Sequence, residues 1–170
     1  RIEKDGEILV KGENVMLGYW RKKEDTDKVI KDGWLYTGDI GEIDPRDGYL
    51  KITDRKKDII VSAGGDNISP AKIENLLSNS PAIDQCMVYG DGKNFLSALI
   101  VPNKEFKGNK DKITKQIDEI NSNLSLVEKI KKFYLIDENF SIENGLLTPT
   151  MKVKRNKVTE KYKNILENFY

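Results

Sequence analysis

Residues 54–58 read Asp-Arg-Lys-Lys-Asp, five consecutive charges between two apolar stretches that each have the composition of a β-strand. A run of this kind cannot be buried, because each charge would lose its hydration without gaining a partner. It therefore predicts a surface turn or a linker between domains. The hydrophobic pattern also differs on its two sides, so we expect the run to divide the chain into two parts.

The part before the run has the pattern of β-structure with tight turns. Short apolar and aromatic stretches predict strands at 7–10 and 34–37, and a hairpin that pairs 41–44 with 49–53. Residues 26–31 are consistent with one or two helical turns that stop at Asp32 and Gly33. Residues 1–54 are too few to bury a core of their own, so we predict that they are the all-β end of a larger N-terminal domain.

The part after the run predicts a small α+β domain, with a short β-sheet and packed helices. Ser69 and Pro70 form a helix start, because serine caps free amides and proline suits the first helical position. Hydrophobic periodicity extends this helix through Ile73, Leu76 and Leu77. The same reasoning predicts strands at 59–61, 85–89, 95–101 and 134–136, and helices around 113–120, 126–133 and 158–169.

Composition excludes several function classes. The 29 basic and 28 acidic residues give a net charge of +1, without the basic excess of a domain that follows nucleic acid. The chain has no histidine, which excludes His-based triads and His metal sites, and we expect no protein-held metal. The lone Cys86 lies in an apolar run and is expected in the core. A single cysteine and the lack of a charged-then-apolar leader favour the cytoplasm.

Three segments carry candidate site residues. Asp39 follows Gly38 at the predicted end of a strand, where a carboxylate could accept two hydrogen bonds from a ribose diol; residue types alone favour a turn-capping role. Arg55 could hold a phosphate or sugar oxygen with its planar donor fork. Gly64 and Gly65 could admit a thin substrate against the backbone, although each of these features is more common in an ordinary surface loop.

The third segment is the basic stretch 147–155, just before the last predicted helix. A lysine on a loop reaches a phosphate as a mobile point charge. Basic residues ahead of a helix oppose its macrodipole, which indicates that they were not placed for stability. Taken alone, the stretch is also consistent with a solvated surface loop.

Together, in this order and spacing, the three segments resemble the adenylate-forming family of acyl-CoA synthetases, luciferases and peptide-synthetase adenylation domains. The resemblance covers essentially the whole chain, and residues 32–74 are its most specific part. It implies the C-terminal β part of a large adenylating domain at 1–54, a hinge at 55–57 and a mobile C-terminal α+β domain at 58–170.

The resemblance also implies roles for single residues. Asp39 is similar to the family's ribose-binding aspartate, Arg55 to its nucleotide-contacting arginine, and Lys57 lies at its hinge. Glu74 resembles a helix glutamate with a structural role. The segment similar to the lining of the pantetheine tunnel for CoA comprises Ser62, Ala63, Gly64 and Gly65.

Lys152 corresponds to the family's catalytic lysine, because it comes four residues after Thr148 and three before Arg155. The pair Thr150-Met151 replaces the commoner Ser-Gly ahead of that lysine. This departure resembles the long-chain fatty acyl-CoA synthetase branch, and it leaves Lys154 as a weaker candidate.

The implied reaction joins a long-chain fatty acid to ATP, with Mg²⁺, to give an acyl-adenylate and pyrophosphate; CoA then yields acyl-CoA and AMP. The implied partners are these small molecules and the N-terminal domain of the same enzyme, without nucleic acid; peripheral membrane contact stays open. The fragment alone is expected to be inactive, because it holds no GxxxxGK-type phosphate loop. The alternatives are a non-catalytic interaction module derived from such a domain and an adenylating enzyme for another carboxylate.

Overall fold

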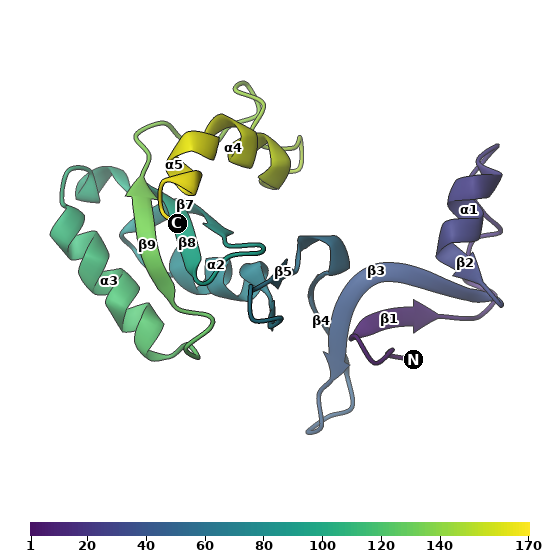
Figure 1. Ribbon diagram of the computed structural model, residues 1–170. Helices are drawn as coiled ribbons and strands as arrows, with labels where there is room; N and C mark the ends of the chain where they lie inside the picture. Colours follow the sequence, from purple (N-terminus) through teal and green to yellow (C-terminus); the bar gives the residue numbers. More distant parts are fainter. The chain divides into compact units, whose positions relative to one another are not determined.

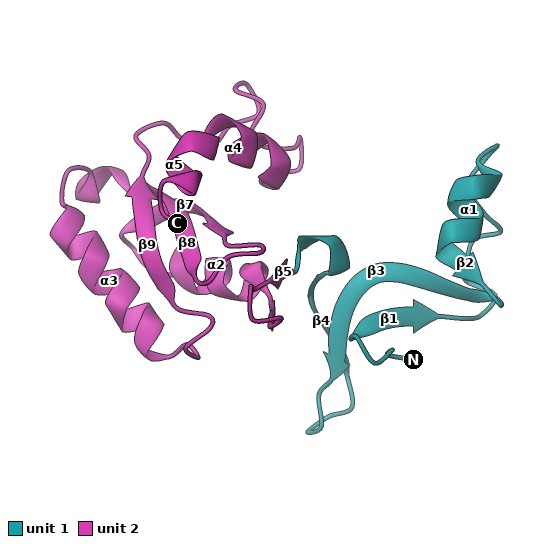
Figure 2. Ribbon diagram, viewed as in Figure 1, with its two compact units in different colours: residues 1–59 teal, residues 60–170 magenta.

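The computed structural model describes residues 1–170, which form two compact units: residues 1–59 and residues 60–170 (Figure 2). The charged run lies at the end of the first unit. Its first two residues complete strand β4 (Leu50–Arg55), and the next three form the 3₁₀ helix η1 (Lys56–Asp58).

The first unit is built around one antiparallel sheet (Figure 1). The central strand β3 pairs with three others, β1, β2 and β4. Few side chains are buried here: Ile8 and Leu9 are the only apolar residues below 9% exposure. The elements are β1 (Glu7–Val10), α1 (Lys23–Val29), β2 (Ile30–Lys31), β3 (Trp34–Ile43), β4 (Leu50–Arg55) and η1.

The helix expected at 26–31 is displaced. Helix α1 begins earlier, at Lys23, and ends at Val29, while the next two residues form β2. Asp32 and Gly33 both have positive φ, 52° and 76°, as in a two-residue type I′ hairpin turn. The Asp-Gly pair is therefore a hairpin turn, which requires a strand on each side of it.

The second unit confirms the predicted α+β class and has three layers (Figure 1). A sheet of order β7-β8-β9 has α2 and α3 on one face and α4 and α5 on the other. Strand β8 is antiparallel to β7 and parallel to β9. The elements are β5 (Ile60–Val61), β6 (Asn67–Ile68), α2 (Pro70–Ser78), β7 (Ile83–Tyr89), β8 (Leu96–Pro102), η2 (Lys104–Phe106), α3 (Lys110–Ser122), β9 (Ile130–Leu135), α4 (Arg155–Lys161) and α5 (Lys163–Glu167).

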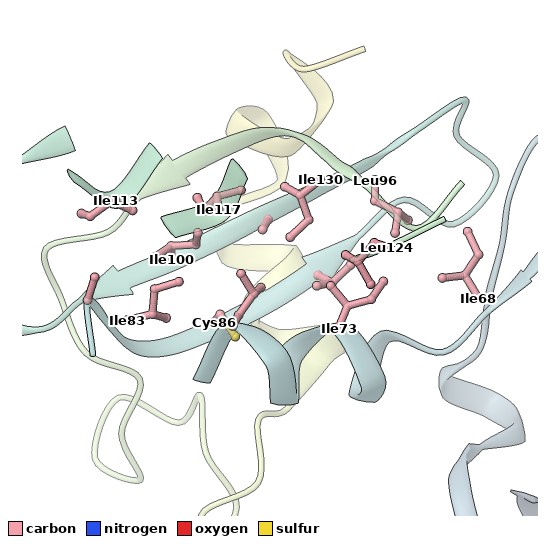
Figure 3. Close-up of a cluster of buried hydrophobic side chains, with 14 of the residues drawn as sticks. Ile68, Ile73, Ile83, Cys86, Leu96, Ile100, Ile113, Ile117, Leu124 and Ile130 are labelled. Carbon is pink, nitrogen blue, oxygen red and sulfur yellow. The ribbon is translucent and has the colours of Figure 1, made fainter. Parts of the chain in front are cut away.

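The central strand β8 is buried on both faces, which explains its uninterrupted apolar sequence. Ala98 and Ile100 contribute to the core beneath α2 and α3 (Figure 3). Leu99 and Val101 point to the opposite face, where they join the core under α4 and α5. Alternate residues of one strand thus serve two separate hydrophobic clusters.

The helix predicted at 126–133 is wrong, because Ile130 begins strand β9. The register with β8 pairs Leu96 with Ile130 but Ser97 with Lys132, so one extra residue bulges out of β9. The bulge separates the inward-facing Ile130 and Phe133 by three residues instead of two. A spacing of three residues is also the spacing of neighbours on one face of a helix.

Two smaller differences concern the other helices. Ser69 caps α2 as predicted, accepting a hydrogen bond from the Lys72 amide, but Leu76 is 36% exposed and lies outside the core. The single helix expected at 158–169 is divided into α4 and α5 at Tyr162. Its apolar stripe still packs inward through Val158 and Leu166.

Candidate functional site

Asp39 and Arg55 lie opposite each other on the adjacent strands β3 and β4. The Nε of Arg55 lies 3.0 Å from Oδ1 of Asp39, and the Asp39 side chain is the less exposed of the two, 27% against 57%. The pairing of β3 with β4 therefore brings together two residues that are 16 positions apart in the sequence. The arginine fixes the orientation of the carboxylate while leaving it accessible to a ligand.

The sequence predicts Asp39 at the end of a strand, but β3 continues past it to Ile43. The register between β1 and β3 shifts between Glu7 and Leu9, so β3 bulges at this point. Gly38 within the bulge has a φ of 70°, a conformation that favours glycine. A bulge redirects the side chains next to it, which accounts for an accessible carboxylate in the middle of a strand.

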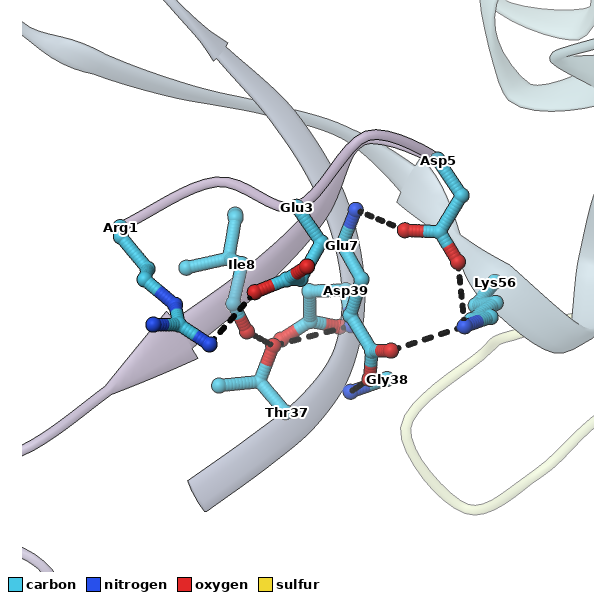
Figure 4. A network of polar contacts seen from close by, with 9 residues as sticks. All are labelled: Arg1, Glu3, Asp5, Glu7, Ile8, Thr37, Gly38, Asp39 and Lys56. Atoms are coloured by element: carbon cyan, nitrogen blue, oxygen red, sulfur yellow. Dashed lines mark hydrogen bonds and ion pairs between the residues drawn. The ribbon is translucent and has the colours of Figure 1, made fainter. Parts of the chain in front are cut away.

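A buried glutamate holds this bulge in place (Figure 4). Glu7 is 5% exposed; one carboxylate oxygen accepts a hydrogen bond from the Gly38 amide at 3.0 Å, and the other lies 2.8 Å from Nζ of Lys56. The same ammonium lies 2.6 Å from Asp5. The hydrogen bond to Asp5, followed by that to Glu7, raises the pKa of Lys56, and Lys56 in turn lowers the pKa of Asp5.

Sequence reasoning did not find this ion-pair group, since Lys56 lies 49 and 51 residues from its two partners. Nothing in a run of five charges indicates which side chains have distant partners. Lys57, the predicted hinge residue, follows Lys56 in η1, and its side chain is exposed. Residues 57–59 separate Lys56, whose side chain is held by the first unit, from the first residue of the second unit.

The predicted tunnel residues form one tight loop in the second unit. The Ser62 hydroxyl donates to Asp66 Oδ2 at 2.9 Å and accepts from the Gly64 and Asp66 amides at 3.2 and 3.0 Å. Gly65 has a φ of 87°. A Cβ on Gly64 would lie 3.3 Å from Asp66 Oδ2. One glycine is thus favoured for its conformation and the other for close packing.

A cavity of about 390 Å³ opens beside this loop. Lys93 and Lys131 lie at the cavity, and neither ammonium has a carboxylate within ion-pair distance. Each lysine lies over an aromatic ring instead, Lys93 over Tyr170 and Lys131 over Phe95. The cavity therefore joins an apolar wall to two unpaired cations. Its lining also includes Ser62, Gly64, Asp66, Ile68, Asn94, Phe95, Leu96, Leu126 and Val127.

Lys152 lies on a small hairpin that is closed by an isolated bridge between Leu147 and Val153. Thr148 fixes its backbone: the Thr148 hydroxyl accepts from the Lys152 amide at 3.0 Å, and the Lys152 carbonyl accepts from the Thr148 amide at 2.8 Å. The Lys152 side chain is exposed and forms no ion pair. Lys154, two residues on, is half-buried.

Met151 adopts a left-handed backbone conformation, with a φ of 63°. This conformation costs a residue with a Cβ about 1–2 kcal/mol. Met151 stands where the commoner pattern has glycine, and glycine would adopt this φ without strain. The geometry thus gives a physical reason for the glycine that this chain lacks.

Glu74 and Arg155 serve the fold of the second unit. Arg155, the first residue of α4, forms an ion pair of 2.5 Å with Glu74 and donates to the Val88 carbonyl at 3.1 Å. Glu74 also accepts from the Val88 amide at 2.7 Å. These contacts join α2, β7 and α4, which matches the structural role expected for Glu74.

Cys86 is in the core, as predicted, and is 7% exposed. Burial, followed by the nearby charge of Glu74, raises the pKa of the Cys86 thiol to about 12. It is therefore protonated at neutral pH and unsuited to nucleophilic chemistry.

None of the helices combines the length and apolar character that a membrane span requires.

Comparisons with known proteins give matches over nearly the whole chain. Residues 57–170 match the family described as AMP-binding enzyme C-terminal domain. The long-chain-fatty-acid–CoA ligase FadD15 of Mycobacterium tuberculosis is 42% identical over 192 residues, which cover 100% of this chain and 32% of that protein. Long-chain-fatty-acid–CoA ligase 6 of Rattus norvegicus is 38% identical over 190 residues, covering 98% of this chain and 27% of its own length.

Among solved structures, the A domain of carboxylic acid reductase from Segniliparus rugosus, in complex with AMP and a co-purified carboxylic acid, superposes with a TM-score of 0.86. It is 28% identical, and the match covers 97% of this chain and 28% of that one. The chain thus spans about a third or less of the proteins that it matches.

Proposed function

This chain belongs to the AMP-binding enzyme C-terminal domain family, and from that premise we propose that it is the C-terminal part of an ATP-dependent long-chain fatty acid–CoA ligase. The complete enzyme would convert a fatty acid and MgATP into an acyl-adenylate and pyrophosphate, and then transfer the acyl group to CoA with release of AMP. We also propose a cytoplasmic location, with peripheral membrane contact left to experiment.

The observation that carries the proposal is the Asp39–Arg55 pair beside Gly38. A ribose diol needs a carboxylate that is oriented and accessible, and Asp39 is held by Arg55 Nε at 3.0 Å while remaining 27% exposed. Gly38 has no side chain that would cover this carboxylate, and the nearest atom to a Cβ built there is Arg55 Nη1 at 4.0 Å. Each hydrogen bond from the diol to the charged group would stabilise bound nucleotide by about 1.5–3 kcal/mol.

Lys152 would supply the charge for adenylation. Attack of a carboxylate on the α-phosphate brings two anions together, so negative charge develops on the phosphoryl oxygens. An ammonium delivered to those oxygens stabilises the transition state more than the ground state. Lys152 suits this role because it extends from a short hairpin with a fixed backbone and has no competing carboxylate partner.

CoA transfer would use a different loop of the small domain. The loop that contains Ser62, Ala63, Gly64 and Gly65 has two adjacent residues without side chains, which would let the pantetheine arm approach the backbone. The adjacent cavity, with Lys93 and Lys131, has the charge to attract the phosphates of CoA and the apolar wall to contact its base. We propose that the small domain turns at Lys57 to exchange one set of groups for the other.

The long-chain substrate rests on the names of the relatives and on Thr150-Met151 in the lysine hairpin. Another carboxylate is the second candidate, because the matching A domain of carboxylic acid reductase also carries this fold at 28% identity. A non-catalytic interaction module is disfavoured, since such a module would not need the ordered Asp39–Arg55 pair of the first unit.

The test is product formation by the intact enzyme with ATP, Mg²⁺, CoA and a panel of palmitate, octanoate and benzoate. Palmitoyl-CoA, AMP and pyrophosphate are the expected products. Asp39→Ala should raise the KM for ATP on the order of a hundredfold, because two hydrogen bonds worth about 3 kcal/mol are lost. Asp47→Ala, an exposed turn aspartate of the same hairpin, is the control. Equal ATP dependence in the two variants would reject the ribose assignment.

A further inference from the structure

The proposed CoA loop does not hold its position alone, because three hydrogen bonds tie it and the strand before it to the turn 90–95. The Val61 amide donates to Asp91 Oδ1 at 3.0 Å, and the Val61 carbonyl accepts from the Gly92 amide at 2.8 Å. The Ala63 amide donates to the Lys93 carbonyl at 2.9 Å. The conformation of this turn therefore sets the position of the loop.

The turn itself has few internal means of support. Gly92 has a φ of 67°, with no atom within 4 Å of where its Cβ would be. Asp91 and Gly92 are exposed, and Lys93 is half-buried. No residue of the turn between Gly90 and Phe95 belongs to either hydrophobic cluster. Within the turn, the Lys93 amide donates to the Gly90 carbonyl at 2.9 Å, and further support comes from other parts of the chain.

Tyr170 provides that support at the end of the turn. Its ring centroid lies 4.6 Å from that of Phe95, with the planes tilted by 31°. Its hydroxyl donates to the Phe95 carbonyl at 3.2 Å and lies 2.9 Å from the hydroxyl of Ser97, which is fully buried in β8. Lys93 Nζ lies 5.0 Å above the same ring. Tyr170 thus joins the turn to the central strand through both stacking and hydrogen bonds.

We propose that Tyr170 is a positioning residue for thioester formation, acting through the turn 90–95 on the loop that contains Ser62–Gly65. The inference rests on the proposed role of that loop in CoA binding. The side-chain hydrogen bonds and ring contacts of Tyr170 are with residues 89–97, so its effect passes through the Phe95 ring and the Lys93 carbonyl. Loss of Tyr170 would release the turn, and with it both the Ala63 amide and the cavity wall at Phe95.

The experiment uses the intact enzyme with Tyr170→Ala, Tyr170→Phe and a control, Tyr134→Ala. Tyr134 is exposed to a similar degree, 43% against 41%, and lies outside this contact group. Three quantities are measured: pyrophosphate release, the KM for CoA in thioester formation from supplied palmitoyl-AMP, and hydrogen exchange of the Val61 and Ala63 amides. Tyr170→Phe keeps the stacked ring but removes the hydroxyl, so it still tests the proposal if Tyr170→Ala fails to fold.

Tyr170→Ala should raise the KM for CoA about tenfold or more, speed exchange of the two amides and leave pyrophosphate release within twofold. Tyr170→Phe should shift the KM and the exchange rate in the same direction by a smaller factor. Unchanged exchange would overturn the positioning role, as would equal losses in both half-reactions. Faster exchange with an unchanged KM for CoA would instead reject the CoA assignment of the loop.

Discussion

Lys152 and Lys154 lie two residues apart on one hairpin, but only Lys152 has an exposed side chain. Because an ammonium that reaches developing phosphoryl charge must be mobile and unpaired, we predict that Lys152→Ala lowers acyl-adenylate formation by about 10²–10³. Transfer of the acyl group from supplied acyl-AMP to CoA should stay nearly intact. The measurement is pyrophosphate release for the first step and thioester formation for the second.

Lys154→Ala provides the matched control and should change either step only a few-fold. Its backbone amide donates to the Leu146 carbonyl, and alanine retains that hydrogen bond. If Lys154→Ala proves to be the crippled variant, the assignment of the catalytic lysine is off by two residues.

Met151 gives a stability prediction at the same hairpin. Met151→Gly removes the strain of a φ of 63°, about 1–2 kcal/mol, but gives back about 0.5–1 kcal/mol through the greater freedom of glycine in the unfolded chain. We expect a net gain of up to about 1.5 kcal/mol in the free energy of unfolding. Chemical denaturation measures it. Leu126→Gly, an exposed loop residue at negative φ, should do the opposite; a loss at Met151 would contradict the strain argument.

At the junction between the units, two neighbouring lysines differ in whether their side chains have partners. Lys56 is held to the first unit by Glu7 and Asp5, while Lys57 next to it is exposed. A charged run that looks uniform in sequence therefore has a fixed residue followed by a free one. This arrangement is what a hinge requires, because rotation is confined to the few residues after the fixed point.

Lys57→Pro should therefore impair thioester formation more than adenylation, by about tenfold or more. Proline fixes φ near −65°, which the 3₁₀ conformation of η1 accommodates, but a pivot residue must change its backbone dihedrals when the small domain turns. Lys57→Ala is the control that keeps backbone freedom. A following proline also disfavours the helical backbone of Lys56, so thermal melting must be unchanged. Equal losses in both half-reactions would place the hinge elsewhere.

At the scale of the whole molecule, the chain covers 32% and 27% of the two curated ligases compared above. Its first unit buries only Ile8 and Leu9 among its apolar residues and leaves Tyr49 and Ile52 at 75% and 62% exposure. We predict that residues 1–170 alone, with ATP, CoA and palmitate, form no palmitoyl-CoA above background. Turnover by the isolated fragment, with the intact enzyme assayed beside it, would contradict this prediction.

The strongest sequence signals were local, and these predicted the fold class and most elements. The Ser69-Pro70 helix start and the apolar run of β8 depend only on neighbouring residues, so both could be predicted without the structure. The helix predicted at 126–133 failed because a bulge changed the apolar spacing of β9. A bulge is set by the partner strand, and sequence periodicity carries no information about it.

The sequence by itself determined the α+β class, the core position of Cys86 and, through its motifs, the family of the chain. Only the tertiary structure decided that Asp39 lies within a bulged strand, that Lys56 is held by Glu7 and Asp5, and that Tyr170 supports the turn beside the proposed CoA loop. The physical reason is the range of the interactions. Capping and periodicity act over a few residues, whereas these contacts join residues 31 to 75 positions apart, which only tertiary packing brings together.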